Sequence, residues 1–135
     1  MLEVLPIQSK TEQEAMSARC GMVYNAEDMA YKALVDGDLI GICQFTMNQD
    51  GGFIHTLGLV KDAEISPKDR AEALFVMGRA TLNFIDLCGV HTAFFEDASF
   101  TDEAMIKAIG FKKNAEGLWW MDLTDFFLHP CQHEH

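Results

Sequence analysis

The sequence predicts an α+β domain, with a mixed and mostly antiparallel sheet and helices on both faces of the sheet. Between residues 30 and 60, apolar β-prone runs alternate with turn sequences, and after Ser66 the apolar residues recur at helical spacing. Three strands followed by helix, strand, helix and hairpin give such a sheet. A length of 135 residues fits a single domain, residues 1–135, with its own core.

The amino-terminal residues predict a short strand and a helix. Glu3 to Ile7 has a β pattern, and Ser9 or Thr11 can cap a helix that runs through Glu12 to Arg19.

The middle of the chain predicts an antiparallel meander of three strands. Tyr31 to Val35 and Leu39 to Met47 are separated by Asp36-Gly37-Asp38. Asp-Gly is typical of a type I′ hairpin turn, in which both central residues have positive φ. A second turn, residues 48–52, leads into the third strand, Phe53 to Val60.

A long helix is predicted after the meander. Ser66 can accept a hydrogen bond from a free amide, Pro67 suits the first helical position, and Asp69 favours the positive end of the helix. Gly89 suits the left-handed position past the helix end. The apolar face is broad, so we expect it to pack on the sheet: Leu74, Val76, Met77, Ala80, Thr81, Phe84, Leu87 and Cys88.

The last third predicts a strand, a short helix and a hairpin. Val90 to Glu96 follows a helical crossover, so we expect it to lie parallel to an earlier strand. A helix begins at Thr101 and ends at Gly110, and the strands Phe111 to Lys113 and Leu118 to Leu123 form the hairpin.

Charge and hydropathy exclude several function classes. With 21 acidic residues against 10 Lys and Arg, the net charge of −11 repels phosphate backbones, so nucleic acid is not an expected partner. The sequence has no run of about 18 apolar residues and no signal-peptide pattern, which predicts a cytoplasmic protein without a membrane span. The acidity attracts cationic small molecules or basic peptides, or serves solubility alone.

The cysteines predict neither a metal site nor a redox pair. The four are far apart and form no CxxC motif: Cys20, Cys43, Cys88 and Cys131. The run from His129 to His135 contains four His and Cys side chains that can bind a metal, but their spacing matches no standard zinc motif, and we interpret residues 129–135 as a flexible tail.

Two short motifs resemble the GNAT superfamily of N-acetyltransferases. Ala108 to Lys113, followed by Glu116 to Met121, is similar to the family's Gly-Phe helix end and closing hairpin. Ile65 to Arg70 is similar to the apolar-x-Pro-x-x-Arg entry to its coenzyme-binding helix. The resemblance covers roughly residues 30–123 and implies an acyl-CoA N-acyltransferase-like fold.

The resemblance also implies a site for the pyrophosphate of acetyl-CoA, because backbone amides at a helix start bind anions. The family has Arg/Gln-x-x-Gly-x-Gly/Ala here, whereas this chain has Ala73 and Phe75 at the two glycine positions. An aromatic ring such as that of Phe75 can fill the space through which the phosphates approach. The implied coenzyme-binding residues are Arg70, Ala71, Glu72, Ala73 and Leu74.

Candidate catalytic residues follow from the chemistry of acyl transfer, which requires a base to deprotonate an amine. His55, on the third meander strand, and Glu96, at the end of the crossover strand, are the candidates, with Asp97 beside Glu96. A strand histidine and solvated loop carboxylates are the plain alternative. The family often has a Tyr acid where this chain has Ile106, and an Asn loosely at Ser99.

Aromatic residues concentrate near the carboxyl end: Trp119, Trp120, Phe126 and Phe127. Because side chains alternate along a strand, one Trp must face away from the core, where it can line a substrate cleft or a homodimer interface or be covered by later residues.

The sequence therefore indicates transfer of an acetyl group from acetyl-CoA to an amine of a small molecule or peptide. The alternative is a GNAT-like binding or dimerisation module without catalysis, since a fold does not determine an activity.

Overall fold

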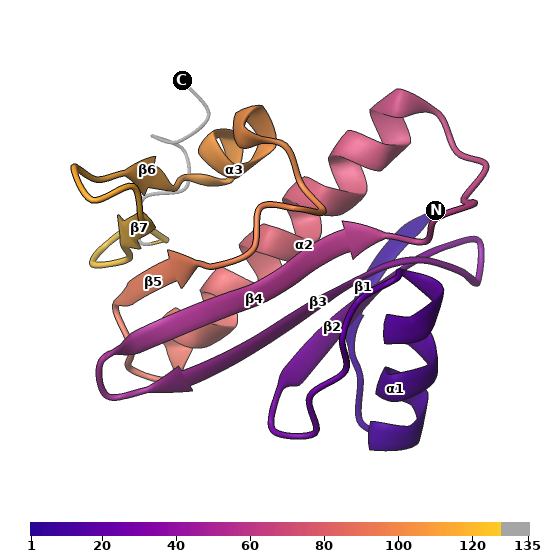
Figure 1. Cartoon of the computed structure of the whole chain (residues 1–135), viewed down its shortest axis with the longest axis horizontal. Coiled ribbons are helices and arrows are strands. Elements are labelled where there is room, and N and C mark those ends of the chain that lie inside the picture. The colour runs from indigo at the N-terminus through magenta and orange to yellow at the C-terminus, as the bar shows by residue number, and fades with distance from the viewer. Residues whose placement is uncertain (128–135) are drawn as a thin grey trace.

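The computed structural model describes residues 1–127, which form a seven-stranded mixed sheet and three helices (Figure 1). The strand order is β1-β2-β3-β4-β5-β7-β6. The strands are β1 (Leu2–Pro6), β2 (Met29–Val35), β3 (Asp38–Asn48), β4 (Gly51–Leu59), β5 (Thr92–Phe95), β6 (Lys112–Lys113) and β7 (Trp119–Asp122). The helices are α1 (Lys10–Arg19), α2 (Pro67–Leu87) and α3 (Glu103–Ile109).

Strands β1 to β4 are antiparallel neighbours, as the turn sequences predict. At the β2–β3 turn, Asp36 and Gly37 have φ angles of 51° and 89°, which confirms the predicted positive φ at both positions. Register across the turn pairs Val35 with Asp38.

Helix α2 carries the chain across the sheet to β5, which pairs with β4 in parallel. Ser66 caps the helix by accepting from the amide of Asp69 at 3.1 Å, and Gly89 ends it with a φ of 87°. Both agree with the sequence prediction.

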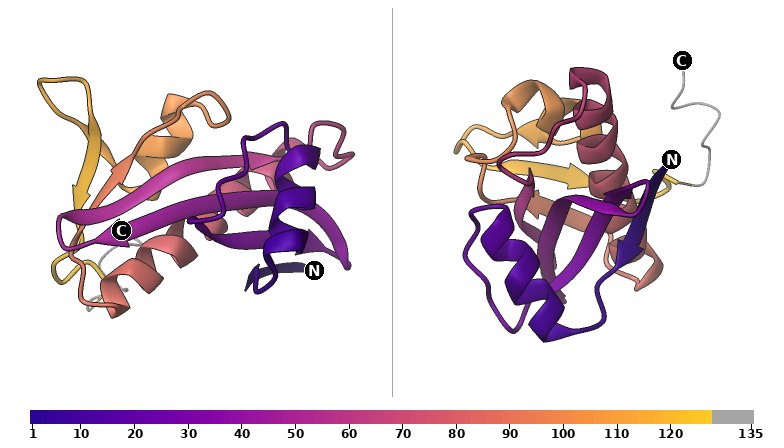
Figure 2. Two further views of the ribbon diagram at one scale, coloured as in Figure 1. Left: turned by 60° about the horizontal axis from the view of Figure 1, so that its bottom comes forward. Right: turned by 90° about the vertical axis from the view of Figure 1, so that its right-hand side faces the viewer.

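Helices α1 and α2 cover opposite faces of the sheet (Figure 2). On the α2 face, a Cβ at Gly52 would lie 2.6 Å from the Ile85 side chain, so the helix packs directly on the strand backbone. On the other face, Gln13 of α1 donates to Gln44 of β3 at 3.1 Å. The main core lies between α2, α3 and the sheet, and its largest buried side chains are Phe45, Phe111, Ile54, Leu57, Met77, Leu82, Ile85, Ile106, Ile109 and Leu123.

The start of α1 agrees with one of the two expected caps, Ser9, whereas the start of α3 differs from the expected residue. Helix α1 begins at Lys10 because Ser9, and not Thr11, accepts from the amide of Glu12. Helix α3 begins at Glu103, since Asp102 caps it by accepting from the amide of Met105 at 2.8 Å. Thr101, where the helix was expected to begin, has a separate role described below.

At the carboxyl end, Trp119 is 6% exposed and Trp120 is 36% exposed, which confirms that the pair divides between the two faces of β7. No helix within residues 1–127 is both long and apolar enough to cross a membrane. The candidate metal ligands from His129 to His135 lie outside the described residues.

Candidate functional site

Only the first part of β4 is paired with β5. Gly52 to Ile54 pairs with Ala93 to Phe95, and the last bond runs from the Glu96 amide to the Ile54 carbonyl at 2.9 Å. Beyond this point β4 continues to Leu59 without β5 beside it. The two strands therefore part at residues 54 and 96.

A β-bulge lies at this point. Gln44 of β3 pairs with Thr56, but the next residue, Phe45, pairs with Ile54, so His55 is an extra residue in β4. Ile54 lies in the core under α2, whereas His55 and Thr56 both contact residues on the α1 face. The bulge thus interrupts the alternation of side chains and directs His55 toward the parting of the strands.

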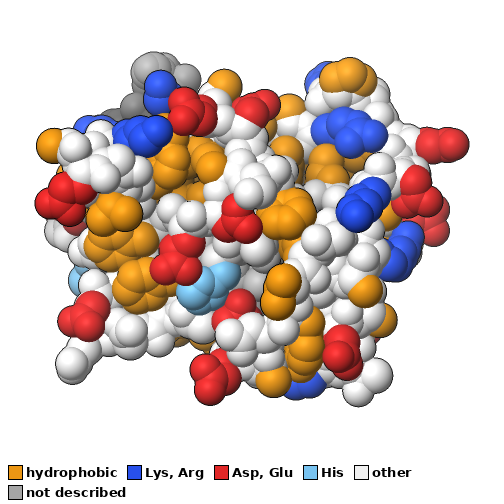
Figure 3. Space-filling model, in the orientation of Figure 1, with side chains coloured by type: hydrophobic (Ala, Val, Ile, Leu, Met, Phe, Trp, Pro, Cys, Tyr) orange, Lys and Arg blue, Asp and Glu red, His pale blue; other side chains and the backbone are white. Residues whose placement is uncertain are grey.

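His55 is held between two carboxyl groups and a hydroxyl. Its Nδ1 is hydrogen-bonded to Oε1 of Glu96, and its Nε2 lies 2.8 Å from Oγ1 of Thr46. Nε2 is also 3.8 Å from Oδ1 of Asp28. Figure 3 shows a histidine among acidic side chains near the middle of this face, with a hydrophobic patch beside it. The two sequence candidates for the base, His55 and Glu96, are in direct contact.

Asp28 is a component of this cluster that the sequence analysis did not identify. Asp28 is 3% exposed, and its Oδ1 has no hydrogen-bond partner among residues 1–127. Burial raises the pKa of Asp28, while the positive charges of His55 and Lys10 act to lower it. A buried carboxyl with an unsatisfied oxygen costs stability and is typical of functional sites.

Replacing Asp28 with Asn is expected to raise the melting temperature at pH 7 by about 3 °C. The pKa of Asp28 is higher in the folded state than in the unfolded state, so the folded chain binds the additional proton. Stability linked to this group is complete below pH about 4 and is lost as the pH rises through the folded pKa.

Thermal melts of the wild type and Asp28→Asn at pH 4 and pH 7 measure this effect, with the exposed Asp38→Asn as the matched control. The gain should be confined to pH 7. A lower melting temperature for Asp28→Asn at pH 7 would show that the carboxylate stabilises the fold.

A buried polar network supports the strand beside His55. The side-chain Nε2 of Gln44 donates to Oγ1 of Thr56 at 3.1 Å and to the carbonyl of Val23 at 3.0 Å. Its oxygen accepts from Gln13 and from Ser17, each at 3.1 Å. Because every polar atom of the Gln44 side chain is paired, this network fixes α1 and β4 relative to each other.

A pocket of about 470 Å³ lies between the end of β4 and the start of α2. Lys61 and Arg70 bring positive charge to it, in a chain whose net charge is −11. Figure 3 shows Lys and Arg side chains gathered on the right of the view, where α2 begins in Figure 1. The pocket is also lined by Cys20, Leu59, Val60, Pro67, Ala71, Leu74, Phe100, Thr101, Asp102 and Met105.

The predicted coenzyme-binding residues occupy different positions relative to this pocket. Arg70, Ala71 and Leu74 line it, whereas Glu72 is exposed on the helix and Ala73 is buried in the core. Arg70 donates from its guanidinium to the carbonyl of Ala63 at 2.7 Å, which holds the loop before α2.

The helix begins before these residues, at Pro67, and helical geometry directs the amides of residues 71–74 toward carbonyls four residues earlier. The amide of Lys68 belongs to the first turn of α2, where helical geometry provides no such carbonyl.

Phe75 does not fill the pocket. Its ring packs against the main core and lies 4.7 Å from the guanidinium carbon of Arg79, outside the residues that line the pocket. The expectation that this ring stands where the phosphates approach is not met at this pocket, because the ring packs against Arg79 and the main core. Ile106 is fully buried in the core.

A different segment, Phe100–Thr101, covers β4 between the two pockets. It crosses the strand beyond the point where β4 and β5 separate. Oγ1 of Thr101 donates to the carbonyl of Leu57, and Thr101 is 4% exposed. A Cβ at Gly58 would lie 2.7 Å from Cβ of Phe100, so the segment rests directly on the backbone of β4. Asp97 and Ser99 form the preceding turn, in which Asp97 accepts from the Ser99 amide at 2.9 Å.

A second pocket, of about 420 Å³, lies on the other side of this crossing. Glu96 lines it together with Phe53, Phe94, Phe95, Gly117, Leu118 and Trp119. The Phe53 and Phe94 rings stack with centroids 5.3 Å apart and an angle of 14° between their planes. This pocket is apolar, with the Glu96 carboxylate at its edge.

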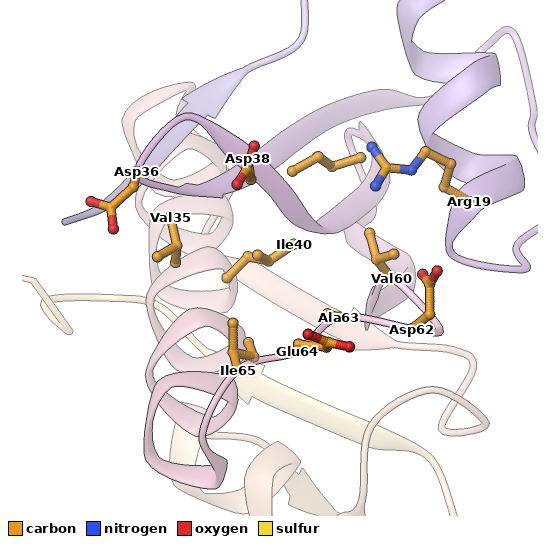
Figure 4. Close-up of a pocket in the computed structure, with 11 residues that line it drawn as sticks. Arg19, Val35, Asp36, Asp38, Ile40, Val60, Asp62, Ala63, Glu64 and Ile65 are labelled. Atoms are coloured by element: carbon orange, nitrogen blue, oxygen red, sulfur yellow. The ribbon is translucent and has the colours of Figure 1, made fainter.

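A third pocket, of about 490 Å³, lies beside the β2–β3 turn (Figure 4). Val35, Ile40 and Ile65 converge on it, and Asp36 points away. Asp36 is paired with the amino-terminal ammonium at 2.5 Å, and the other acids around this pocket, Asp38, Asp62 and Glu64, are exposed. The pocket shares none of the residues of the His55 cluster.

Comparison with solved structures identifies the fold. The ribosomal-protein-S18-alanine N-acetyltransferase from Escherichia coli matches with a TM-score of 0.62 at 10% identity, over 89% of each chain. A GNAT-family protein from Desulfovibrio desulfuricans matches with a TM-score of 0.65 at 10% identity, over 91% of this chain and 99% of that one.

YhhK from Escherichia coli, solved bound to coenzyme A, matches with a TM-score of 0.57 at 14% identity, over 90% of this chain and 97% of that one. No family model matches the sequence, and no curated protein matches it. The chain thus has the fold of the GNAT acetyltransferases, with a sequence far diverged from these structures.

Proposed function

From the GNAT fold of this chain, we propose that it transfers the acetyl group of acetyl-CoA to a primary amine. The observation that carries the proposal is the contact of Glu96 with His55 at the parting of β4 and β5, between a pocket with two cationic side chains and an apolar pocket. The direct contact between a carboxylate and an imidazole supports proton removal from an amine.

The positions of the two pockets suit the shape of acetyl-CoA. Leu59 lines the cationic pocket and Phe53 lines the apolar one, and the two residues are six positions apart on β4. Six strand residues span about 20 Å. A coenzyme whose phosphates and thioester lie at opposite ends of a long flexible arm can extend along β4 between them. Lys61, Arg70 and the amide of Lys68 are the groups that would hold the pyrophosphate.

The chemistry of transfer then rests on the Glu96–His55 pair. Acetyl-CoA supplies the thioester when it is bound. Glu96 binds the ammonium group of the acceptor and, with His55, accepts the proton that the amine must lose before it becomes a nucleophile. The amine nitrogen forms a bond to the acetyl carbon as the carbon–sulfur bond breaks, and the thiolate takes a proton from solvent, since Ile106 has no proton to donate.

The crossing of Phe100–Thr101 over β4 favours a second function, a binding module without catalysis. The Thr101–Leu57 hydrogen bond and the contact of Phe100 with Gly58 lie between the two pockets. Transfer requires this segment to move away from β4. A chain in which it does not move binds ligands separately in each pocket.

Thermal melts with about 1 mM acetyl-CoA, together with an assay of thiol release in the presence of amines, test the proposal. Binding at 100 times Kd stabilises a native state by about 2.7 kcal/mol, so the melting temperature should rise by several degrees. Lys61→Ala should reduce this rise, and Lys112→Ala, an exposed cation outside the pocket, should not. No thermal shift and no thiol release would support the binding module.

A further inference from the structure

We infer that the apolar pocket beside Glu96 binds a primary amine carried on an aromatic group, and that such an amine is the acceptor. The inference rests on the proposed function and names its substrate class. The observation behind it is that stacked rings, an exposed leucine and one carboxylate line a single pocket of about 420 Å³. Pockets of a few hundred Å³ hold small molecules.

The rings of Phe53 and Phe94 form one wall. They lie on paired positions of β4 and β5, with planes only 14° apart, and both are partly exposed. Two stacked rings at a pocket edge can be extended by a further aromatic ring. A flat aromatic ligand makes more contact in such a stack than a flexible polar chain.

The β6–β7 turn forms another part of the pocket lining. Leu118 is 52% exposed although it lies in a pocket, and Trp119 beside it is 6% exposed. A ligand that covers Leu118 removes apolar surface from water. The exposed leucine therefore indicates the side of the pocket on which the apolar group of the ligand rests.

Charge determines the other end of the ligand. Of the described residues that line this pocket, Glu96 is the only charged one, and its side chain is 49% exposed. Lys113 lies near, but its ammonium is over the Trp119 ring at 5.3 Å and is paired with Glu103 at 3.3 Å. A single exposed carboxylate beside apolar walls favours one ammonium group attached to an apolar body, and not a polyamine.

Trp119 provides a direct probe of this pocket. Replacing Trp120, the only other tryptophan, with Phe leaves Trp119 as the sole reporter. We expect 2-phenylethylamine to change its fluorescence saturably without any coenzyme. We expect 2-phenylethanol, which keeps the ring but has no charge, and spermidine, which has charge but no ring, each to bind at least about 10-fold more weakly.

Variants in the same background test the two walls and the carboxylate. Glu96→Gln should weaken 2-phenylethylamine binding by about 10-fold, and Leu118→Asn, on an exposed turn, by about 5-fold. Leu87→Ala, which removes an exposed leucine at the far end of α2, should leave binding unchanged.

The outcomes separate this inference from the proposed function. Binding of 2-phenylethylamine with its acetylation supports both. Binding without acetylation confirms the ligand of the pocket and overturns the proposed function. Acetylation of spermidine with no binding of 2-phenylethylamine would overturn the inference and leave the function standing. Equal binding of amine and alcohol, or no effect of Glu96→Gln on binding, would also overturn it.

Discussion

Glu96→Gln is expected to lower kcat for acetyl transfer by about 100-fold or more, because a positioned base contributes at least this factor. The amide of Gln cannot accept the proton of the ammonium, although it can still contact His55. Steady-state thiol release with a saturating amine measures kcat.

Asp97→Asn is the matched control, since it makes the same change on the adjacent residue, whose carboxylate accepts from the Ser99 amide. Its kcat should stay within about twofold of the wild type, because this carboxylate has no part in the proposed proton transfer. Equal losses of kcat in both variants would show that negative charge near the separation of β4 and β5, and not the Glu96–His55 contact, accounts for the effect. A Glu96→Gln variant with full activity would contradict the assignment of the base.

Thr101→Val is expected to strengthen binding of acetyl-CoA by up to about 10-fold. The substitution keeps the side-chain shape but leaves the buried carbonyl of Leu57 without its donor. The conformation in which Phe100–Thr101 crosses β4 therefore loses about 1–3 kcal/mol of stability. When the conformation that can bind is a small fraction of the population, raising that fraction lowers the apparent Kd in proportion.

Calorimetric titration of acetyl-CoA measures this Kd, and Thr11→Val, at an exposed position on α1, serves as the control. An unchanged Kd for Thr101→Val would mean that the crossing is not a barrier. A weaker Kd would mean that Phe100–Thr101 forms part of the binding site in its present position.

The fold was predictable because its boundaries are set by local chemistry. Asp36-Gly37 adopts the turn that its residues favour, and Ser66-Pro67 and Gly89 begin and end the long helix where their backbone preferences suit these positions. The parallel placement of β5 followed from the helical crossover alone. Such signals depend on a few adjacent residues and can be read without tertiary contacts.

The sequence named both residues of the candidate base, but it did not predict their contact. His55 and Glu96 meet because a bulge in β4 and the β4–β5 register place residues 41 positions apart at the same point. Chemistry identified both side chains, whereas the bulge depends on the pairing of Gln44 with Thr56 and has no signal in the residues themselves.

Asp28 and Phe100–Thr101 were missed for a related reason. Each belongs to a loop whose sequence resembles a solvated connection, yet Asp28 and Thr101 are 3% and 4% exposed. Phe75 was assigned to the pocket from its place in a motif, and the packing of its ring with Arg79 places it elsewhere. Burial of loop residues depends on neighbours that are distant in sequence, and the direction of the Phe75 ring depends on its packing against Arg79 and the core.

The most direct test of acetyl-CoA binding along β4 is an amide NMR titration of the chain with acetyl-CoA. We expect shifts in one continuous track, from Lys68 and Arg70 at the start of α2, along β4 through Leu57 and Gly58, to His55 and Glu96. Shifts confined to the start of α2, with residues 55–58 unchanged at saturation, would contradict it.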